Sequence, residues 1–166
     1  MCGQTTAKAP EGIPLHRVES TMDLYEAMMS MAPDYDVIIQ AAAPADYRFA
    51  VSHQQKLKKE GGMPLVLELV ENPDIAAAIG AQRKPNQTLV GFAAETQNLD
   101  INARKKLEKK NLDMIVANDV SQAGAGFNVD TNIATLITHK GSKECSLRTK
   151  KELAQDILDE ILLLRS

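Results

Sequence analysis

The stretch DVIIQAAAPADYR, residues 36–48, decides the fold class of this 166-residue chain. Its first half, Asp36 to Ala42, is apolar on both faces, which is typical of a parallel strand covered by helices on both sides. The chain then passes through the small side chains of Ala41, Ala42 and Ala43 into a carboxylate and a guanidinium, Asp46 and Arg48. We therefore expect a buried parallel strand whose carboxyl end opens onto a polar site.

The same arrangement occurs twice more along the chain. TLVGFA (88–93) and DMIVA (113–117) are both apolar enough to be buried strands, and polar residues follow each of them closely. Helical patterns at 72–80 and 100–110 separate the three strands. Strand and helix in alternation predict a sheet with right-handed parallel crossovers.

The C-terminal part adds antiparallel structure to this pattern. IATLIT (133–138) and CSLRT (145–149) flank the turn residues 139–142 and predict a hairpin. Thr149 and Glu152 form a capping-box pattern that opens a last amphipathic helix through Leu164. The expected fold is α/β, a Rossmann-like three-layer α/β/α arrangement with a mostly parallel sheet and a small antiparallel annex. At this length, residues 1–166 are expected to form one domain.

The N-terminal half contains elements outside this alternation. Leu15 to Glu19 reads as a short strand, and residues 20–23 resemble the cap of a helix that runs to about Met31. Residues 49–62 are polar and lysine-rich and end in two glycines, which predicts a mobile loop. Pro64 to Val70 alternates in the manner of another strand.

Composition excludes several classes of protein. The net charge of -3 and the aromatic content of 4% argue against nucleic acid as a partner, which needs a basic surface and stacking platforms. There is no apolar run of ~18 residues and no signal-peptide pattern, so we expect no membrane partner and a cytoplasmic location. Cys2 and Cys145 lie far apart and are expected to be free thiols. The three histidines are scattered, which argues against a catalytic zinc site.

The polar residues that follow the three strands indicate where a ligand binds. In an open α/β sheet, ligands bind outside the carboxyl ends of the strands. Small residues at those ends let a flat ligand reach the main-chain N–H and C=O groups. Tight packing of helix on sheet explains any one such strand end equally well. Three of them together favour a ligand of nucleotide size.

Other features point to the same kind of ligand, although each has a simpler reading. The helix that starts at residues 72–76, with Asn72 as N-cap and Pro73 at its first position, directs free N–H groups toward this edge, or is an ordinary capped helix. Asp100 is the expected cap of the next helix, where Lys106 and Lys110 share a face that suits a phosphate or is simply solvated. Lys56, in the loop, is either a lid contact or an exposed lysine.

Two common nucleotide-binding motifs are missing. The sequence has neither a Walker A loop nor a G-x-G-x-x-G fingerprint, which argues against a dehydrogenase-like dinucleotide domain. No Ser-His-Asp or Cys-His arrangement is evident. An enzyme built on this chain would therefore work by positioning its substrates and by stabilising charged groups.

Six motifs, in order and spacing, resemble the bacterial phosphopantothenoylcysteine synthetases. They are AAAPADYR, a lysine ten residues after its aspartate, ENPDI, GFAAET, ARKKLEKKNLDMIVANDV and GFNVDTN. These synthetases are the ligase half of the bifunctional coenzyme A biosynthesis flavoprotein. The resemblance extends from about residue 15 to the C-terminus.

The resemblance implies a ligation that depends on CTP and Mg²⁺. The carboxylate of phosphopantothenate attacks the α-phosphate of CTP and gives an acyl-cytidylate and pyrophosphate. The amine of cysteine then displaces CMP. The family also implies a homodimer, and no FMN is expected, because the flavin-dependent decarboxylase half is not part of this chain. The alternative is a nucleotide-binding module without catalytic activity.

The family's functional residues can be carried over motif by motif. Asp46 and the main chain of Ala41, Ala42 and Ala43 would contact the nucleoside, and Lys56 would sit on a flap and neutralise charge near the α-phosphate. The resemblance does not identify the magnesium ligands. The remaining implied residues of the CTP pocket are Pro73, Asp74, Ile75, Ala76, Phe92, Lys106 and Lys110; the two lysines would hold the triphosphate.

Two departures from the family pattern stand out. Pro44 replaces the usual valine and removes a backbone N–H that a ligand could use. The family domain begins with a strand, a GPT-type turn and an SSGKMG-type segment, and the GPT-type turn and SSGKMG-type segment are not found here. We therefore expect a domain that lacks its N-terminal strand–helix segment, together with the asparagine thought to stabilise the acyl-cytidylate, and whose activity could be lost.

Overall fold

The structure, a computed structural model, describes residues 1–5, 7–53, 55–58, 61–62, 64–95, 98–120, 125 and 129–166. Its described residues divide into two compact units. The hairpin unit comprises Met1–Ala27 and Pro44–Asp74, and the sheet unit comprises Met28–Ala43 and Ile75–Ser166. Helix α1 (Thr21–Met31) has residues in both. Each unit is described by itself.

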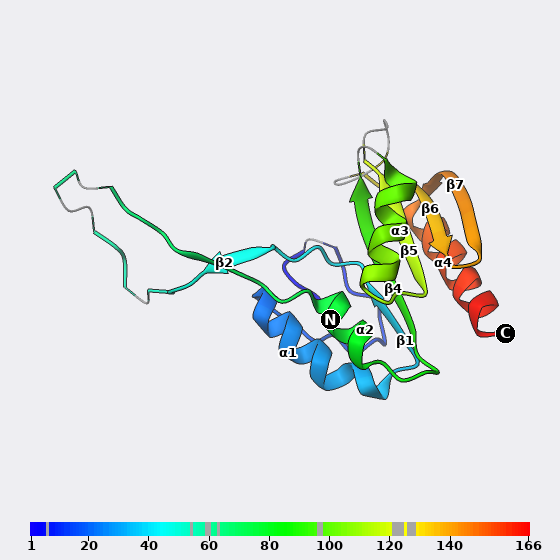
Figure 1. Cartoon of the computed structure of the whole chain (residues 1–166), viewed down its shortest axis with the longest axis horizontal. Helices are drawn as coiled ribbons and strands as arrows, with labels where there is room; N and C mark the ends of the chain where they lie inside the picture. Colours follow the sequence, from blue (N-terminus) through cyan, green and yellow to red (C-terminus); the bar gives the residue numbers. More distant parts are fainter. Residues whose placement is uncertain are drawn as a thin grey trace. The chain divides into compact units, whose positions relative to one another are not determined.

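The sheet unit is built on one mixed five-stranded sheet in the order β1-β4-β5-β6-β7 (Figure 1). β1, β4 and β5 are parallel, and β5, β6 and β7 are antiparallel. This confirms the expected α/β class, with the predicted C-terminal hairpin extending the main sheet. The elements are η1 (Ala32–Asp34), β1 (Val37–Gln40), α2 (Ile75–Gln82), β4 (Thr88–Glu95), α3 (Leu99–Lys109), β5 (Met114–Asp119), β6 (Thr131–Thr138), β7 (Gly141–Thr149) and α4 (Lys150–Arg165).

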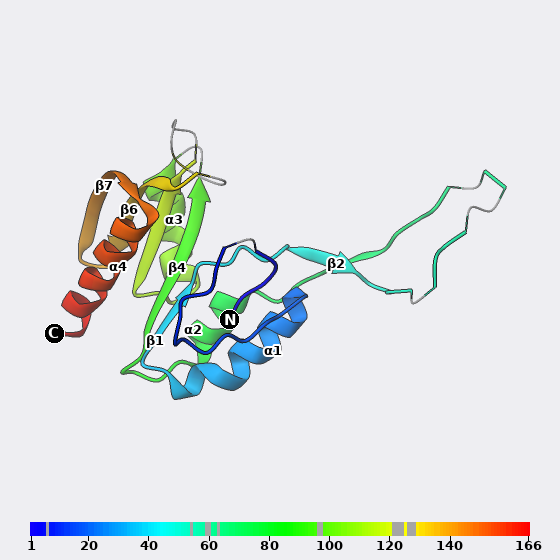
Figure 2. The same ribbon diagram turned by 180° about the vertical axis from the view of Figure 1, so that it is seen from behind.

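Helices α3 and α4 cover opposite faces of this sheet, which gives the expected three layers (Figures 1 and 2). Because side chains alternate along a strand, β5 directs Met114 and Val116 into a core shared with α4 and Ile115 toward the other face. α3 buries Ala103 and Leu107. The core on the α4 side consists of Val90, Met114, Val116, Ala134, Leu136, Cys145, Leu153, Ile157 and Ile161.

The predicted capping box at the start of α4 is confirmed. The amide of Glu152 donates to Thr149 Oγ1 at 3.2 Å, and the amide of Thr149 donates to Glu152 Oε2 at 2.9 Å. The hydrogen bonds from the Thr149 side chain and backbone lower the pKa of Glu152. Arg165, at the other end of the helix, donates through its NH1 to the carbonyls of Asp36 and Asn86 and so ties α4 to the start of β1.

Helix α3 is bounded by two asparagines in the left-handed conformation, and its predicted cap is wrong. The N-cap is Asn98 (φ 50°), without a side-chain capping bond, and Asp100 instead pairs with Arg104 across one turn at 2.9 Å. The helix ends with Asn111 (φ 51°) in a Schellman motif, in which Leu112 donates to the carbonyl of Leu107. Asparagine tolerates this region of φ better than most residues, which suits it to both ends.

The hairpin unit contains β2 (Tyr47–Phe49), β3 (Leu69–Glu71) and most of α1. β2 and β3 pair antiparallel, and the described residues between them extend away from the pair (Figure 1). The predicted cap of α1 is confirmed, since the amide of Asp23 donates to Ser20 Oγ and the amide of Ser20 donates to Asp23 Oδ2. The hydrogen bond with the Ser20 backbone lowers the pKa of the Asp23 carboxyl most, and the hydrogen bond with the Ser20 side chain adds to this effect.

Two predicted strands in this unit are wrong or displaced. Leu15 to Glu19 forms no strand. Its Arg17 makes one isolated β-bridge with Cys2, and the neighbouring residues do not extend this bridge into a ladder. The strand expected at Pro64 to Val70 is reduced to Leu69–Glu71, and its partner β2 includes Phe49, the first residue of the predicted loop. The pairing is short, so most of the alternating apolar side chains before β3 remain exposed.

Candidate functional site

Hydrogen bonds join the motif around Asp46 to the segment that precedes α2. The amide of Asn72 donates to the Asp46 carbonyl at 2.7 Å, and Asn72 Nδ2 donates to the Ala45 carbonyl at 2.8 Å. Arg48 NH1 donates to the carbonyl of Glu71 at 2.5 Å and to Asn72 Oδ1 at 3.2 Å. Asp46 thereby borders a hollow of about 250 Å³, lined also by Tyr47, Glu71 and Asn72.

This junction changes the role assigned to Asn72. Helix α2 begins at Ile75, so Pro73 and Asp74 precede the helix, and Asn72 does not stand at its N-cap position. The Asn72 side chain instead donates to the Ala45 carbonyl and accepts from Arg48. The guanidinium of Arg48 is therefore one of the groups that join the two motifs.

The parallel register brings the carboxyl ends of β1, β4 and β5 to one edge of the sheet unit. Ala41, Ala42 and Ala43 follow β1 there as exposed, irregular backbone. Phe92 of β4 is half-buried and packs against the core on the α4 side. Ile75 and Ala76, the first residues of α2, are buried.

Two amide side chains at this edge were not among the predicted site residues. Gln40 Oε1, at the end of β1, and Asn118 Oδ1, near the end of β5, are buried and find no hydrogen-bond partner among the described residues. A buried acceptor left unsatisfied costs about 1–3 kcal/mol. The available signal in the sequence was a polar residue placed directly after an apolar run of strand residues.

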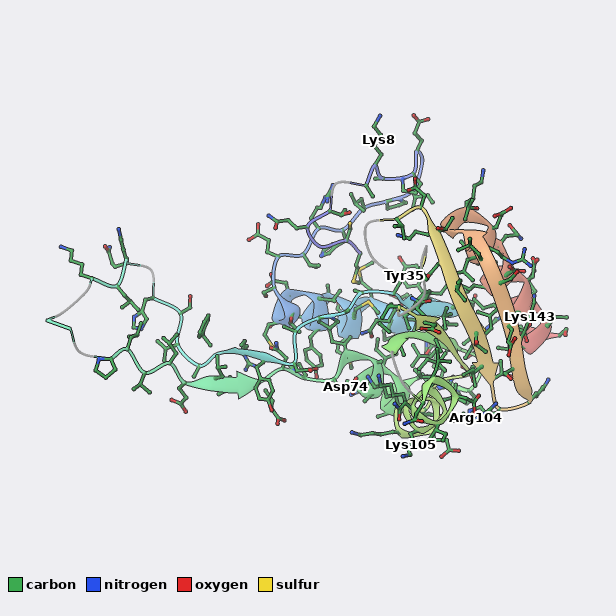
Figure 3. The ribbon with its side chains drawn as sticks, turned by 90° about the horizontal axis from the view of Figure 1, so that it is seen from above. Lys8, Tyr35, Asp74, Arg104, Lys105 and Lys143 are labelled. Atoms are coloured by element: carbon green, nitrogen blue, oxygen red, sulfur yellow. The ribbon has the colours of Figure 1, made fainter. Side chains whose placement is uncertain are left out.

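The two lysines predicted to hold phosphates lie at the far end of α3. Lys106 is in the last turn of that helix and Lys110 is its C-cap, at the end that leads into the start of β5. Both side chains are half-buried. Arg104 and Lys105 also project from α3 (Figure 3). The helix thus carries Lys106 and Lys110 toward the amino end of β5, and the structure does not bring them to the strand ends beside Ala41–Ala43.

Asp46, Lys56, Pro73 and Asp74 belong to the hairpin unit, so the structure does not determine their position relative to the residues of the sheet unit. Lys56 is exposed and lies in irregular structure between β2 and β3. Parts of two motifs, residue 96 of GFAAET and residues 126–128 of GFNVDTN, fall outside the described residues.

Within the part of the chain that is described, no group of three or more His, Cys, Asp or Glu side chains could hold a metal ion. The same residues contain no helix that is long and apolar enough to cross a membrane. Cys2 and Cys145 are free thiols, as expected, and burial raises the pKa of Cys145.

Comparisons with known proteins give the family. The sequence profile of the DNA/pantothenate metabolism flavoprotein C-terminal domain matches residues 1–164. The coenzyme A biosynthesis bifunctional protein CoaBC of Bacillus subtilis is 42% identical over 164 residues, which is 98% of this chain and 40% of that protein. The CoaBC protein of Vibrio vulnificus is 41% identical over 160 residues, 96% of this chain and 40% of that protein.

A solved structure agrees with these relatives. The crystal structure of the C-terminal domain of CoaBC superimposes with a TM-score of 0.79 at 37% identity, covering 98% of this chain and 71% of that one. The chain thus spans about 40% of the length of the curated relatives that it matches. The resemblance drawn from the six motifs is confirmed, and the chain belongs to the DNA/pantothenate metabolism flavoprotein C-terminal domain family.

Proposed function

We propose that this chain acts in coenzyme A biosynthesis, in the cytoplasm, as a CTP-dependent ligase that joins phosphopantothenate to cysteine. The phosphopantothenate carboxylate attacks the α-phosphate of CTP, forming an acyl-cytidylate and releasing pyrophosphate. The cysteine amine then attacks the acyl carbon, forms the amide and releases CMP. The observation that carries this proposal is the junction of Asp46, Arg48 and Asn72, which joins two of the family motifs beside a hollow.

The nucleoside half of the proposed site combines side chains and main chain. The Asp46 carboxylate accepts hydrogen bonds from the nucleoside, and the exposed backbone of Ala41, Ala42 and Ala43 offers further donors and acceptors. The buried oxygen of Asn118 is suited to a ligand N–H or O–H, since a donor there would satisfy it. The other residues proposed to line this pocket are Pro73, Asp74, Ile75, Ala76 and Phe92.

Lysines supply the positive charge in the proposal. Lys56 neutralises the α-phosphate as the acyl-cytidylate forms and breaks. Lys106 and Lys110, which lie away from the strand ends, hold the triphosphate where it extends from the nucleoside pocket toward the end of α3. Mg²⁺ commonly takes one or two carboxylates and fills its other positions with water and substrate phosphates, so it would enter with CTP. We propose no FMN site in this chain.

A turnover assay tests the proposal directly. The protein is mixed with CTP, Mg²⁺, phosphopantothenate and cysteine, and pyrophosphate and CMP are followed. Formation of both supports the ligase. CTP binding by calorimetry without either product supports the alternative, a nucleotide-binding module, and equal affinity for ATP and CTP would refute recognition of the base. Lys56→Gln is expected to lower turnover much more than CTP affinity.

We also propose that the chain forms a homodimer through the segment between β2 and β3. This segment exposes large apolar side chains, with Val66 87% exposed, beside a hollow of about 490 Å³. An exposed apolar surface of this kind marks an interaction site. Light scattering on the intact protein should give a mass twice that of the 18.1 kDa chain. The Val66→Glu variant should give the mass of a single chain. The exposed apolar residues are Phe49, Val51, Leu57, Leu65, Val66, Leu67 and Leu69.

A further inference from the structure

The backbones of α2 and α3 touch near their C-terminal ends, at Gly80. A Cβ atom at Gly80 would lie 2.0 Å from the Lys110 carbonyl oxygen and 3.3 Å from Asn111 Cβ. No side chain larger than hydrogen fits at that separation. The end of α3 that carries Lys110 is therefore set directly against α2.

Asn111 joins these two helix ends with both ends of its amide. Its Nδ2 donates to the Gly80 carbonyl at 2.7 Å, and its Oδ1 accepts from Arg83 NH2 at 3.2 Å. The left-handed backbone of Asn111, at φ 51°, gives its side chain this position immediately after the helix. A residue whose side chain lacked the amide could end α3 but could not make these two bonds.

Arg83 extends the connection to the sheet. Its NH1 pairs with Asp113 and also donates to the Gln87 carbonyl at 3.2 Å. Asp113 Oδ2 accepts the amide of Leu89, at the start of β4, at 2.8 Å. The ends of α2 and α3 and the starts of β4 and β5 thus form one hydrogen-bonded junction, and the Arg83 side chain is only 15% exposed within it.

We propose that Asn111 is a positioning residue for the phosphate-binding lysines. The inference rests on the proposed role of Lys106 and Lys110 at the CTP triphosphate. Lys110 is the residue that precedes Asn111, and Lys106 lies one helical turn earlier. The first residue of α2, Ile75, is five residues before Gly80, or about 7–8 Å along the helix. The Asn111 amide is therefore one of the contacts that set the position of both lysines relative to α2.

The chain offers a matched pair of variants to test this. Asn111→Gly removes both amide bonds, while glycine keeps the left-handed backbone that ends the helix. Asn98→Gly makes the same substitution at the other left-handed asparagine of α3, which is exposed and makes no side-chain capping bond. CTP affinity is measured by calorimetry on the intact protein with Mg²⁺, and thermal unfolding is recorded to confirm that each variant is folded at the temperature of the titration.

Asn111→Gly should weaken CTP binding about 3- to 10-fold, as expected for the loss of about one net hydrogen bond, and Asn98→Gly should change it less than twofold. In a Lys110→Gln background, Asn111→Gly should lower CTP affinity little further, because the lysine that Asn111 positions is already gone. A merely structural role would lower the unfolding temperature and leave the affinity unchanged.

The outcomes separate this inference from the function that it assumes. If Lys110→Gln weakens CTP binding and folded Asn111→Gly does not, the inference is overturned and the proposed function stands. If the unaltered protein binds no CTP, or Lys110→Gln binds it normally, the proposed lysine site fails first and the inference falls with it. Additive losses in the double variant would also overturn it.

Discussion

Replacing Gly80 by alanine should destabilise the protein, although the change lies inside a helix where alanine is normally the better residue. Alanine is favoured over glycine by up to about 1 kcal/mol in a helix interior. Here the added Cβ would lie 2.0 Å from the Lys110 carbonyl oxygen, a backbone atom that cannot rotate away. The helix ends must separate, which costs about 1–3 kcal/mol in overpacking and about 1 kcal/mol for each bond that is lost at Asn111. The net loss should be about 2–4 kcal/mol.

Urea unfolding followed by far-ultraviolet circular dichroism measures this loss. Gly91→Ala is the control, because its Cβ would meet Leu112 Cδ1 at 2.7 Å, the far end of a side chain that can adjust. We expect about 1 kcal/mol or less for Gly91→Ala. If Gly80→Ala unfolds at the same urea concentration as the unaltered protein, or at a higher one, the close approach of α2 to Lys110 is wrong.

Three further predictions follow from individual contacts. Asn72→Ala removes the side-chain bonds to Ala45 and Arg48 and should weaken CTP binding several-fold in calorimetry, whereas Tyr47→Phe, which loses only one long contact of 3.4 Å, should not. Asn118→Leu removes a buried oxygen that has no partner in the described part of the chain, so the unfolding temperature should stay the same or rise while CTP affinity falls; a fall in both would contradict the reading of that oxygen as a ligand contact. Glu152 has a pKa below its ordinary value of 4.5, so its contribution to stability is present above that pH and is lost as the pH falls through the lowered pKa. In acid titrations of stability, Glu152→Gln should remove that part of the pH dependence, and an identical curve would refute it.

The elements that follow from local chemistry agree with the sequence pattern. The capping box at Thr149 and Glu152 and the reciprocal bonds of Ser20 and Asp23 need only residues three positions apart, so the pattern contains all the information. The same holds for β5, whose apolar run is buried on both faces. Its burial was predictable because helices on both sides of a parallel sheet require it.

Features that depend on partners distant in sequence were not predictable in this way. Asn72 is of a residue type that often forms an N-cap, but its side chain is hydrogen-bonded to Ala45 and Arg48, which lie 27 and 24 residues away. Asp100 is likewise a reasonable cap, but the left-handed Asn98 is the N-cap and places the helix start two residues earlier. The strand expected at Leu15 to Glu19 requires a ladder, and only one bridge forms.

The candidate site shows the same division. The small residues after β1 and near the end of β4 mark the edge of the sheet from sequence alone, because strand ends and small side chains are both visible there. The oxygens of Gln40 and Asn118, which find no partner among the described residues, cannot be recognised from the sequence, since this depends on how their neighbours are placed. The placement of Lys106 and Lys110 also depends on where α3 ends, which Asn111 determines.

The pairing of β1 with β4 has a consequence for the order of folding. Val37 pairs with Thr88, and the whole segment between β2 and β3 lies between them in the chain. The hairpin of β6 and β7, in contrast, joins Thr138 to Gly141 through two residues. Because closing a long loop costs entropy before its contacts form, β6, β7 and α4 should assemble first, and β1 should join the sheet late. The amides of β1 are therefore expected to be the last in the sheet to become protected from solvent hydrogen exchange during refolding.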